Sequence, residues 1–260
     1  MALFSPLHYP GKLPLLTLTG TWTFLTADYW ASHHAYAELA TEFKPAREEL
    51  AEYKSRFLFP FGAPPNFIFS KEPITKLTDL RGKKIRATEI ENNALNFMGA
   101  VPVALGPVEV AEALQRGTLD GASQTMTGGG TYGYHEVAKY VFRIPLSGNV
   151  FGVAISDKAW KSIPGGDQKI MQQVAEEMPD ANVRIYLQAG DIAWEKKMRD
   201  LGITFTDPSQ ADKEEYAKIV DEVVLGEWVK DREAMGLPGQ KALDFFRSAC
   251  AKYEKLSPYK

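Results

Sequence analysis

The sequence predicts an α/β fold with a mostly parallel sheet, and three observations support this prediction. The 260 residues are 45% hydrophobic and 24% charged, which is typical of a globular protein with a substantial core. Short apolar runs alternate with helical patterns between residues 77 and 121. Glycines follow the expected helices, where a left-handed cap is favoured. Strands that alternate with helices favour parallel pairing in one sheet.

The most regular pattern of the chain lies between residues 77 and 121. We expect the following elements there: a strand at 84–87, a helix at 92–98 closed by Gly99, a strand at 101–104, a helix at 108–115 stopped by Gly117, and a third strand that starts at 119–121. Ligands of such sheets bind outside the carboxyl ends of the strands. Arg86 and Gln124 stand at or just past two of these ends.

The other elements follow from the same periodicity and from glycine and proline positions. We expect a loop and a strand in 1–25, a helix over 33–53 broken or kinked at Pro45, strands at 56–61 and 66–69, a flexible turn at 127–131, a short helix at 134–140, a strand at 150–155, a long helix over 166–197, a strand at 203–205, and helices over 212–231 and 240–255.

Composition and motifs exclude several functions. The formal net charge of -3 gives no electrostatic case for nucleic acid or an anionic membrane, and no apolar run reaches the ~20 residues of a spanning helix. His135 and Glu136 begin an HExxH pattern that lacks its second histidine, and the Gly128–Gly133 run is no dinucleotide fingerprint. No nucleophile elbow or phosphate-binding loop occurs. We therefore expect a protein that is not an enzyme, has no cofactor and has no metal-site residues of its own. The sequence leaves open whether a metal takes part in ligand binding.

Four sequence blocks, in this order and spacing, carry a resemblance to a known family: DLRGKKIR, MGAVPVALGPVEVAEALQRGTLDG, YHEVAKYV and ISDKAWKSIPGGDQKIMQQVAEE. Together they resemble the substrate-binding proteins of tripartite ATP-independent periplasmic (TRAP) transporters, the DctP-like family, from about Leu77 to the C-terminus. The resemblance implies a two-lobe fold of the periplasmic binding protein type (class II-like), with hinge strands near 61–69 and 150–155 and a long helix that spans both lobes.

The same mapping predicts how the chain divides between the lobes. Lobe I would comprise 1–64 plus 151–190, lobe II would comprise 65–150 plus 191–230, and 231–260 would form a helical tail. The segment MALFSPLHYPGKLPL is similar to an internal part of family members, so the first lobe is expected to be N-terminally incomplete. A signal-peptide pattern is absent from this segment. The expected periplasmic location follows from the resemblance alone.

Arg86 is the first candidate for ligand binding. A guanidinium matches a carboxylate with two parallel hydrogen bonds, and in the resembled family the arginine of this block binds the substrate carboxylate. The alternative is an arginine paired with Glu89 or Glu91. Gln124 stands where the family usually has asparagine, and the alternative for it is a solvated loop residue. Asn66 aligns with a second family arginine, which implies a monocarboxylate or a less charged acid.

Aromatic residues form a second group of candidates. Tyr132, Tyr134 and Phe151 could line a site for a ligand with apolar or ring character, and ordinary packing is the alternative for each. The resemblance also suggests, more weakly, three residues of the first lobe, namely Phe4, Ser5 and Trp22.

The resulting functional prediction is an extracytoplasmic receptor that binds a small organic acid and delivers it to the membrane subunits of a TRAP transporter. Two alternatives stay open: an interaction module that no longer binds ligand, and an enzyme that uses the same site. We expect a monomer that is not inserted in the membrane. A dimer through an exposed sheet edge is possible, because missing strands in the first lobe would leave that edge unpaired.

Overall fold

The computed structural model describes residues 1–26, 28–62, 64–148 and 150–259, and the chain divides into two compact units. Unit 1 comprises residues 1–63, 148–187 and 227–260, and unit 2 comprises residues 64–147 and 188–226. The fold is the expected mixed α/β type. Residues 227–260 belong to unit 1 rather than to a separate tail, because the last helix, α12 (Gly239–Leu256), packs against α1 (Tyr29–Glu42).

Unit 2 is built on a six-stranded sheet. Its strand order is β5-β4-β6-β3-β7-β9, and the strands are β3 (Phe67–Ser70), β4 (Lys84–Arg86), β5 (Val101–Val103), β6 (Gly121–Gln124), β7 (Tyr140–Phe142) and β9 (Thr204–Thr206). The pairs β4–β5, β4–β6 and β7–β9 are parallel, whereas β3 is antiparallel to both β6 and β7. The expected mostly parallel sheet is therefore present, with β3 reversed.

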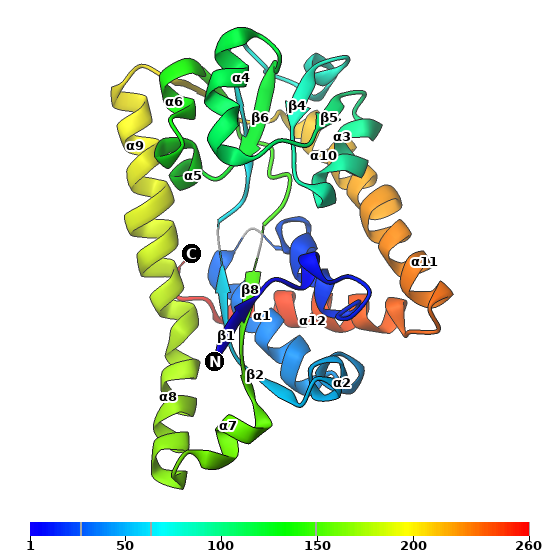
Figure 1. Cartoon of the computed structure of the whole chain (residues 1–260). Coiled ribbons are helices and arrows are strands. Elements are labelled where there is room, and N and C mark those ends of the chain that lie inside the picture. The colour runs from blue at the N-terminus through cyan, green and yellow to red at the C-terminus, as the bar shows by residue number, and fades with distance from the viewer. Residues whose placement is uncertain (27, 63, 149, 260) are drawn as a thin grey trace. The chain divides into compact units, whose positions relative to one another are not determined.

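Helices pack beside this sheet in two groups, which Figure 1 shows within unit 2. The first group contains α4 (Val110–Arg116), α5 (Met126–Thr131), α6 (Tyr134–Val137) and α9 (Ala193–Asp200). The second contains α3 (Asn92–Phe97) and α10 (Gln210–Ile219), with the π-helical segment Val220–Leu225 that continues α10. Short 3-10 helices at Leu77–Leu80, Glu89–Glu91 and Pro107–Glu109 complete the unit. The expected glycine stops are confirmed, since Gly99 and Gly117 have φ values of 79° and 73°.

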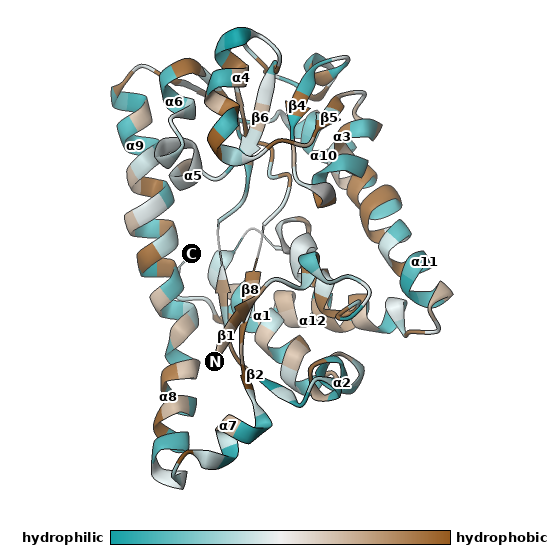
Figure 2. Cartoon of the chain, in the orientation of Figure 1, coloured by the Kyte–Doolittle hydropathy of each residue, from teal (hydrophilic) through white to brown (hydrophobic). Residues whose placement is uncertain are grey.

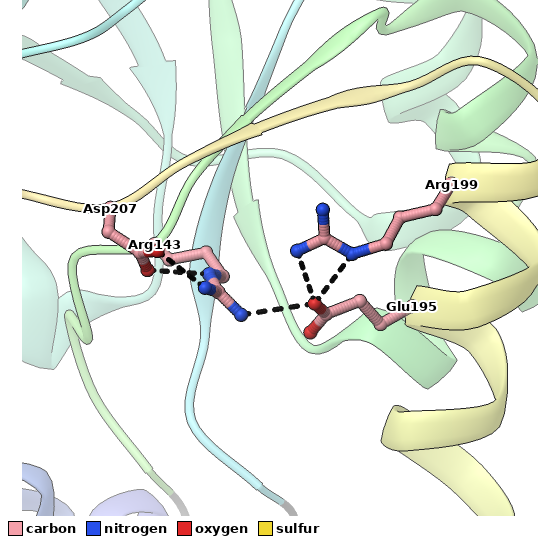
Figure 3. Close-up of polar contacts among 4 residues, drawn as sticks. All are labelled: Arg143, Glu195, Arg199 and Asp207. Carbon is pink, nitrogen blue, oxygen red and sulfur yellow. Dashed lines mark hydrogen bonds and ion pairs between the residues drawn. The ribbon is translucent and has the colours of Figure 1, made fainter.

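A network of ion pairs ties the far edge of this sheet to α9 (Figure 3). Arg143 follows β7 and binds both carboxylate oxygens of Asp207, which follows β9, at 2.7 and 2.6 Å. Its Nη1 also binds Glu195 on α9 at 3.0 Å, and Glu195 accepts two further hydrogen bonds from Arg199. Because one arginine contacts both elements, it fixes the end of β9 against α9.

Unit 1 contains a smaller, fully antiparallel sheet with the order β1-β8-β2. Its strands are β1 (Ala2–Phe4), β2 (Ser55–Gly62) and β8 (Val150–Ser156). Its helices besides α1 and α12 are α2 (Lys44–Glu52), α7 (Asp157–Ser162), α8 (Gly165–Asn182) and α11 (Gly226–Ala234), with 3-10 helices at Pro6–His8 and Leu16–Phe24. The expected helix at 33–53 is confirmed with its break, because α2 starts anew with Pro45 in its first turn.

Two long helical runs contain π-helical stretches. One of them runs from α10 through Val220–Leu225 into α11. The expected helix over 166–197 runs from α8 through the π-helical segment Val183–Ile192 into α9. Among the described residues, no helix is both long enough and apolar enough to cross a bilayer.

Candidate functional site

Arg86 is the last residue of β4 and is 9% exposed. Its guanidinium donates from Nε to the Leu105 carbonyl at 3.0 Å and from Nη1 to the Ser123 carbonyl at 3.1 Å. No carboxylate among the described side chains lies within ion-pair distance of it. The alternative of a pair with Glu91 is therefore wrong, and the Glu89 side chain lies outside the described residues. Arg86 is a nearly buried cation held in place by backbone carbonyls, and its Nη2 group has no hydrogen-bond partner among the described residues.

Gln124 ends β6, and because β6 runs parallel to β4 it lies at the same edge of the sheet as Arg86. Its side chain is half-buried, and its Oε1 accepts from the Thr125 amide at 3.0 Å. A Cβ on Gly128 would lie 2.5 Å from the Gln124 side-chain amide carbon. Glycine at 128 is thus what leaves room for this side chain.

The glycine run after Gln124 is helix α5, so the expected flexible turn at 127–131 is wrong. Thr125 caps the helix by accepting from the Gly128 amide at 2.9 Å. The buried Asp191 accepts from the Met126 and Thr127 amides at 3.1 and 2.9 Å. These two caps satisfy the free amides of the first turn. They outweigh the low helix propensity of glycine and fix the segment next to the site.

Asn66 immediately precedes β3, which pairs antiparallel with β6 so that Phe67 lies opposite Gln124. Asn66 therefore lies at the same edge of the sheet as Arg86 and Gln124. Its Nδ2 group donates to Glu91 Oε1 at 3.0 Å and to Ser147 Oγ at 3.3 Å. The amide end of Asn66 is turned toward a buried acid rather than toward solvent.

Glu91 is the residue of this region that sequence reasoning missed in its actual role. It is 0% exposed, and its Oε1 also accepts from Ser123 Oγ at 2.6 Å and from Ser147 Oγ at 2.7 Å, while Oε2 accepts from the Thr88 amide at 2.8 Å. Its side-chain partners come from distant parts of the chain, so no local pattern announces them. Four donors make the buried carboxylate tolerable without a cation.

The two tyrosines lie next to each other, with ring centroids 6.4 Å apart, but differ in access. Tyr132 is 37% exposed. Tyr134 is fully buried in the core of unit 2, where its hydroxyl donates to the Pro107 carbonyl at 3.1 Å. Burial raises the pKa of the Tyr134 phenol, against the lowering effect of the nearby Arg86 charge. Tyr134 therefore packs beneath the site, and only Tyr132 offers an accessible ring.

The remaining candidates belong to unit 1. Phe151 lies on β8 opposite Phe61, in unit 1. Phe4 packs its ring over Gly152 in the same sheet, and Ser5 is buried. The side chain of Trp22 lies outside the described residues.

One edge of the unit 2 sheet thus gathers a fixed guanidinium, two amide side chains and an accessible tyrosine. The described residues hold no cluster of three or more histidine, cysteine, aspartate or glutamate side chains suited to a metal ion. A guanidinium with free donors favours a carboxylate or another anion as its partner.

Curated relatives match parts of the chain. YiiZ of Salmonella typhimurium is 43% identical over 77 residues, which are 29% of this chain and 24% of that protein. The sialic acid-binding periplasmic protein SiaP of Vibrio cholerae is 26% identical over 142 residues, which are 53% of this chain and 44% of that protein. The chain thus spans less than half the length of these relatives.

Solved structures match almost the whole chain in fold. A TRAP periplasmic solute-binding protein from Desulfovibrio salexigens has a TM-score of 0.84 at 21% identity and covers 99% of this chain and 79% of its own. A TRAP solute-binding protein from Rhodoferax ferrireducens, solved with copurified benzoate, has a TM-score of 0.82 at 22% identity and covers 98% and 79%.

A family model matches residues 65–231, a range that contains all of unit 2 except Pro64. That model describes the DctP family, the bacterial extracellular solute-binding proteins of family 7. Because the match extends over more than half of the sequence and the fold agrees with solved TRAP solute-binding proteins, this chain belongs to the DctP family of solute-binding proteins.

Proposed function

We propose that this chain is a periplasmic receptor that binds a small organic acid through Arg86 and delivers it to the membrane subunits of a TRAP transporter. The observation that carries the proposal is the state of Arg86: a nearly buried cation, fixed by two carbonyls, with no carboxylate partner among the described side chains. A buried charge without a counter-charge is costly, so the folded protein gains free energy when an anion fills that position.

The ligand class follows from the same edge of the sheet. Arg86 supplies one cation, and Asn66 stands where the resembled family has a second arginine. One cation matches one carboxylate. Two solved proteins of similar fold contain small aromatic acids, one benzoate and the other 3-hydroxybenzoate. Tyr132 adds an accessible aromatic ring. We therefore infer a monocarboxylate, with an aromatic acid as the first class to test.

Isothermal titration of the purified chain against mono-, di- and aromatic carboxylates tests this function. The informative variant is Arg86→Lys, which keeps the charge but removes the planar fork, and its matched control is Arg116→Lys, an exposed arginine paired with Glu112 on the surface of α4. We expect one acid class to bind, and Arg86→Lys to weaken it by ~10-fold or more while the control leaves the affinity unchanged. No binding by any acid, or equal binding by both variants, would remove Arg86 as the anchor.

A further inference from the structure

The buried Glu91 determines which way the Asn66 amide faces. With three donors on Oε1 and an amide on Oε2, Glu91 has the hydrogen-bond pattern of an ionised carboxylate, which can only accept. The Nδ2 end of Asn66 must therefore turn toward it. Both Nδ2 hydrogens are used, one on Glu91 and one on Ser147.

The opposite end of this amide is then the end left for a ligand. Asn66 is half-buried, and within the part of the chain that the structure describes, its Oδ1 takes no hydrogen bond. An amide oxygen is an acceptor. This oxygen can accept a hydrogen bond from a ligand hydroxyl group. A second ligand carboxylate at the same place would be repelled, because both oxygens carry only lone pairs.

Ser123 joins this arrangement to the proposed anchor. Its carbonyl accepts from Arg86, and its hydroxyl donates to Glu91. One residue thus lies between the cation and the buried anion. A ligand carboxylate on Arg86 is compensated by that cation. A second carboxylate near Asn66 would meet the buried Glu91 charge, which has no ion-pair partner among the described side chains. Like charges brought together away from water repel strongly.

We propose that Glu91, acting through Asn66, makes the site selective for a hydroxylated monocarboxylate and against dicarboxylates. This inference rests on the proposed function, because it takes Arg86 as the anchor of the first carboxylate. Asn66 is then the residue that contacts the ligand hydroxyl, and Glu91 is a positioning residue that fixes the amide and supplies the repelling charge.

The test is a selectivity measurement with matched acids. Benzoate, its three monohydroxy and three monocarboxy derivatives, and butanoate with 3-hydroxybutanoate and butanedioate are titrated into the intact chain. We expect the best hydroxy acid to bind ~3- to 10-fold more tightly than its parent, as for one added neutral hydrogen bond. Dicarboxylates are expected to bind ~100-fold or more weakly than that hydroxy acid.

Two variants separate the two roles. Glu91→Gln removes the charge and allows the Asn66 amide to turn. The ratio of the hydroxy-acid affinity to the dicarboxylate affinity should therefore fall by ~10-fold or more. Asn66→Leu should remove the preference for the hydroxyl and keep the rejection of dicarboxylates. Glu112→Gln, on the exposed surface of α4, is the control that should change neither ratio. A merely structural role would lower all affinities together and leave the ratios unchanged.

The outcomes distinguish this inference from the proposed function. If dicarboxylates bind the unmodified chain as well as hydroxy acids do, or if neither variant changes the ratios while Arg86→Lys still loses binding, the inference is overturned and the function stands. If no acid of either series binds, both are overturned. If Glu91→Gln does not fold, the affinity ratio between hydroxy acid and parent acid in Asn66→Leu decides alone. That variant should fold, because residue 66 is half-buried and Glu91 keeps three hydrogen-bond donors without the Asn66 amide.

Discussion

In each unit of this protein a buried glutamate lies close to an arginine, Glu91 near Arg86 in unit 2 and Glu49 near Arg232 in unit 1, and these two centres differ in what they bind. In unit 2, Arg86 and Glu91 meet at Ser123, and the guanidinium keeps donors that no described residue uses. In unit 1, Glu49 accepts from the Leu15 and Leu16 amides at 2.6 and 3.1 Å. In unit 1 the buried glutamate thus binds backbone amides of the folded chain. In unit 2 the arginine keeps hydrogen-bond donors that a ligand can use.

The arginine of the unit 1 centre, Arg232 on α11, is engaged on several sides. It donates to the Pro14 carbonyl and to Thr17 Oγ1, both at 3.1 Å, and its Nη1 lies 3.9 Å from Asp231. Its guanidinium also stacks 5.3 Å from the Trp228 ring. These contacts attach the 14–17 segment to α11.

The two centres show that a buried arginine indicates a ligand site only when no carboxylate lies within ion-pair distance of its guanidinium. Arg232 already has an ion-pair partner in Asp231 and a ring contact with Trp228, so its interactions lie within the folded chain. Within the described part of the chain, the Arg86 guanidinium donates to backbone carbonyls only, and Arg86 stands at the carboxyl end of a parallel strand. Such a position is where α/β sheets bind ligands.

Alanine substitution of the two arginines should have opposite consequences, with a loss of acid binding at Arg86 and a loss of stability at Arg232. Arg86→Ala should weaken binding of the best acid by ~2–5 kcal/mol. It should change the melting temperature little, because the cost of burying this cation without an ion-pair partner offsets its two hydrogen bonds to carbonyls. Arg232→Ala should lower the free energy of unfolding by about 1–3 kcal/mol, since it loses two hydrogen bonds and its packing on Trp228, and should leave acid binding intact.

Calorimetric titration and urea unfolding of both variants measure this. Equal losses of binding in the two variants would mean that the two centres do not differ in the way described.

The next effect concerns pH and the unit 1 centre. Burial raises the pKa of Glu49 to about 7, against the lowering effect of the two amide hydrogen bonds. Because the folded chain then binds a proton more tightly than the unfolded chain, stability from this group is greatest at low pH and falls as pH rises from about 4.5 toward 7. The total change should approach about 2–3 kcal/mol.

Thermal unfolding of the unmodified chain and of Glu49→Gln between pH 4.5 and 7.5 checks this trend. The difference between the two is the informative quantity, because His33, whose pKa is lowered to about 4 by burial, changes stability in the opposite direction. It makes the fold lose stability as pH falls from 6.5 toward 4. A pH-independent difference between the two proteins would contradict the assignment to Glu49.

Two glycines, one in each unit, differ in what a methyl group at their position would contact. A Cβ on Gly152 in unit 1 would lie 2.4 Å from the Phe4 ring, and a Cβ on Gly128 would lie 2.5 Å from the Gln124 side chain. A packed ring cannot move cheaply, so Gly152→Ala should cost about 1–3 kcal/mol of stability. Gln124 can swing away, so Gly128→Ala should cost less stability and instead change acid affinity.

Melting temperatures and titrations of both glycine variants report on this distinction. A Gly128→Ala protein with unchanged affinity would show that the position of Gln124 does not matter for binding.

The smallest expected effect lies at the sheet edges. Leu3 on β1 and Val101 on β5 are both exposed, at 55% and 47%. Figure 2 shows β1 and β8 at the hydrophobic end of the scale, and β1 borders a hollow of about 420 Å³ that also contacts Ile170 and Val174. Leu3→Lys should change stability by no more than about 0.5 kcal/mol, but it should reduce self-association, because charged residues protect sheet edges.

Light scattering after gel filtration measures this, with Val101→Lys as the matched substitution in unit 2. Identical association in the two variants would show that the apolar face of unit 1 has no special role.

Local signals predicted much of unit 2. Strand β4, helix α3 with Gly99, and helix α4 with Gly117 all follow from periodicity and glycine caps. Arg86 could be named as a candidate because it ends a strand within a family block. The errors arose where distant residues decide. Asp191 caps the glycine-rich α5 from 64 residues away, and Glu91 finds its side-chain partners at 66, 123 and 147. A single sequence gives no sign of such contacts.

If Arg86 binds the carboxylate of the ligand, a double-mutant cycle between protein and ligand will detect that contact. The best acid and its methyl ester are titrated into the unmodified chain and into Arg86→Gln. If the guanidinium binds the carboxylate, esterification should cost ~2 kcal/mol or more in the unmodified chain and almost nothing in the variant. Equal costs in both proteins would mean that the acid binds without Arg86.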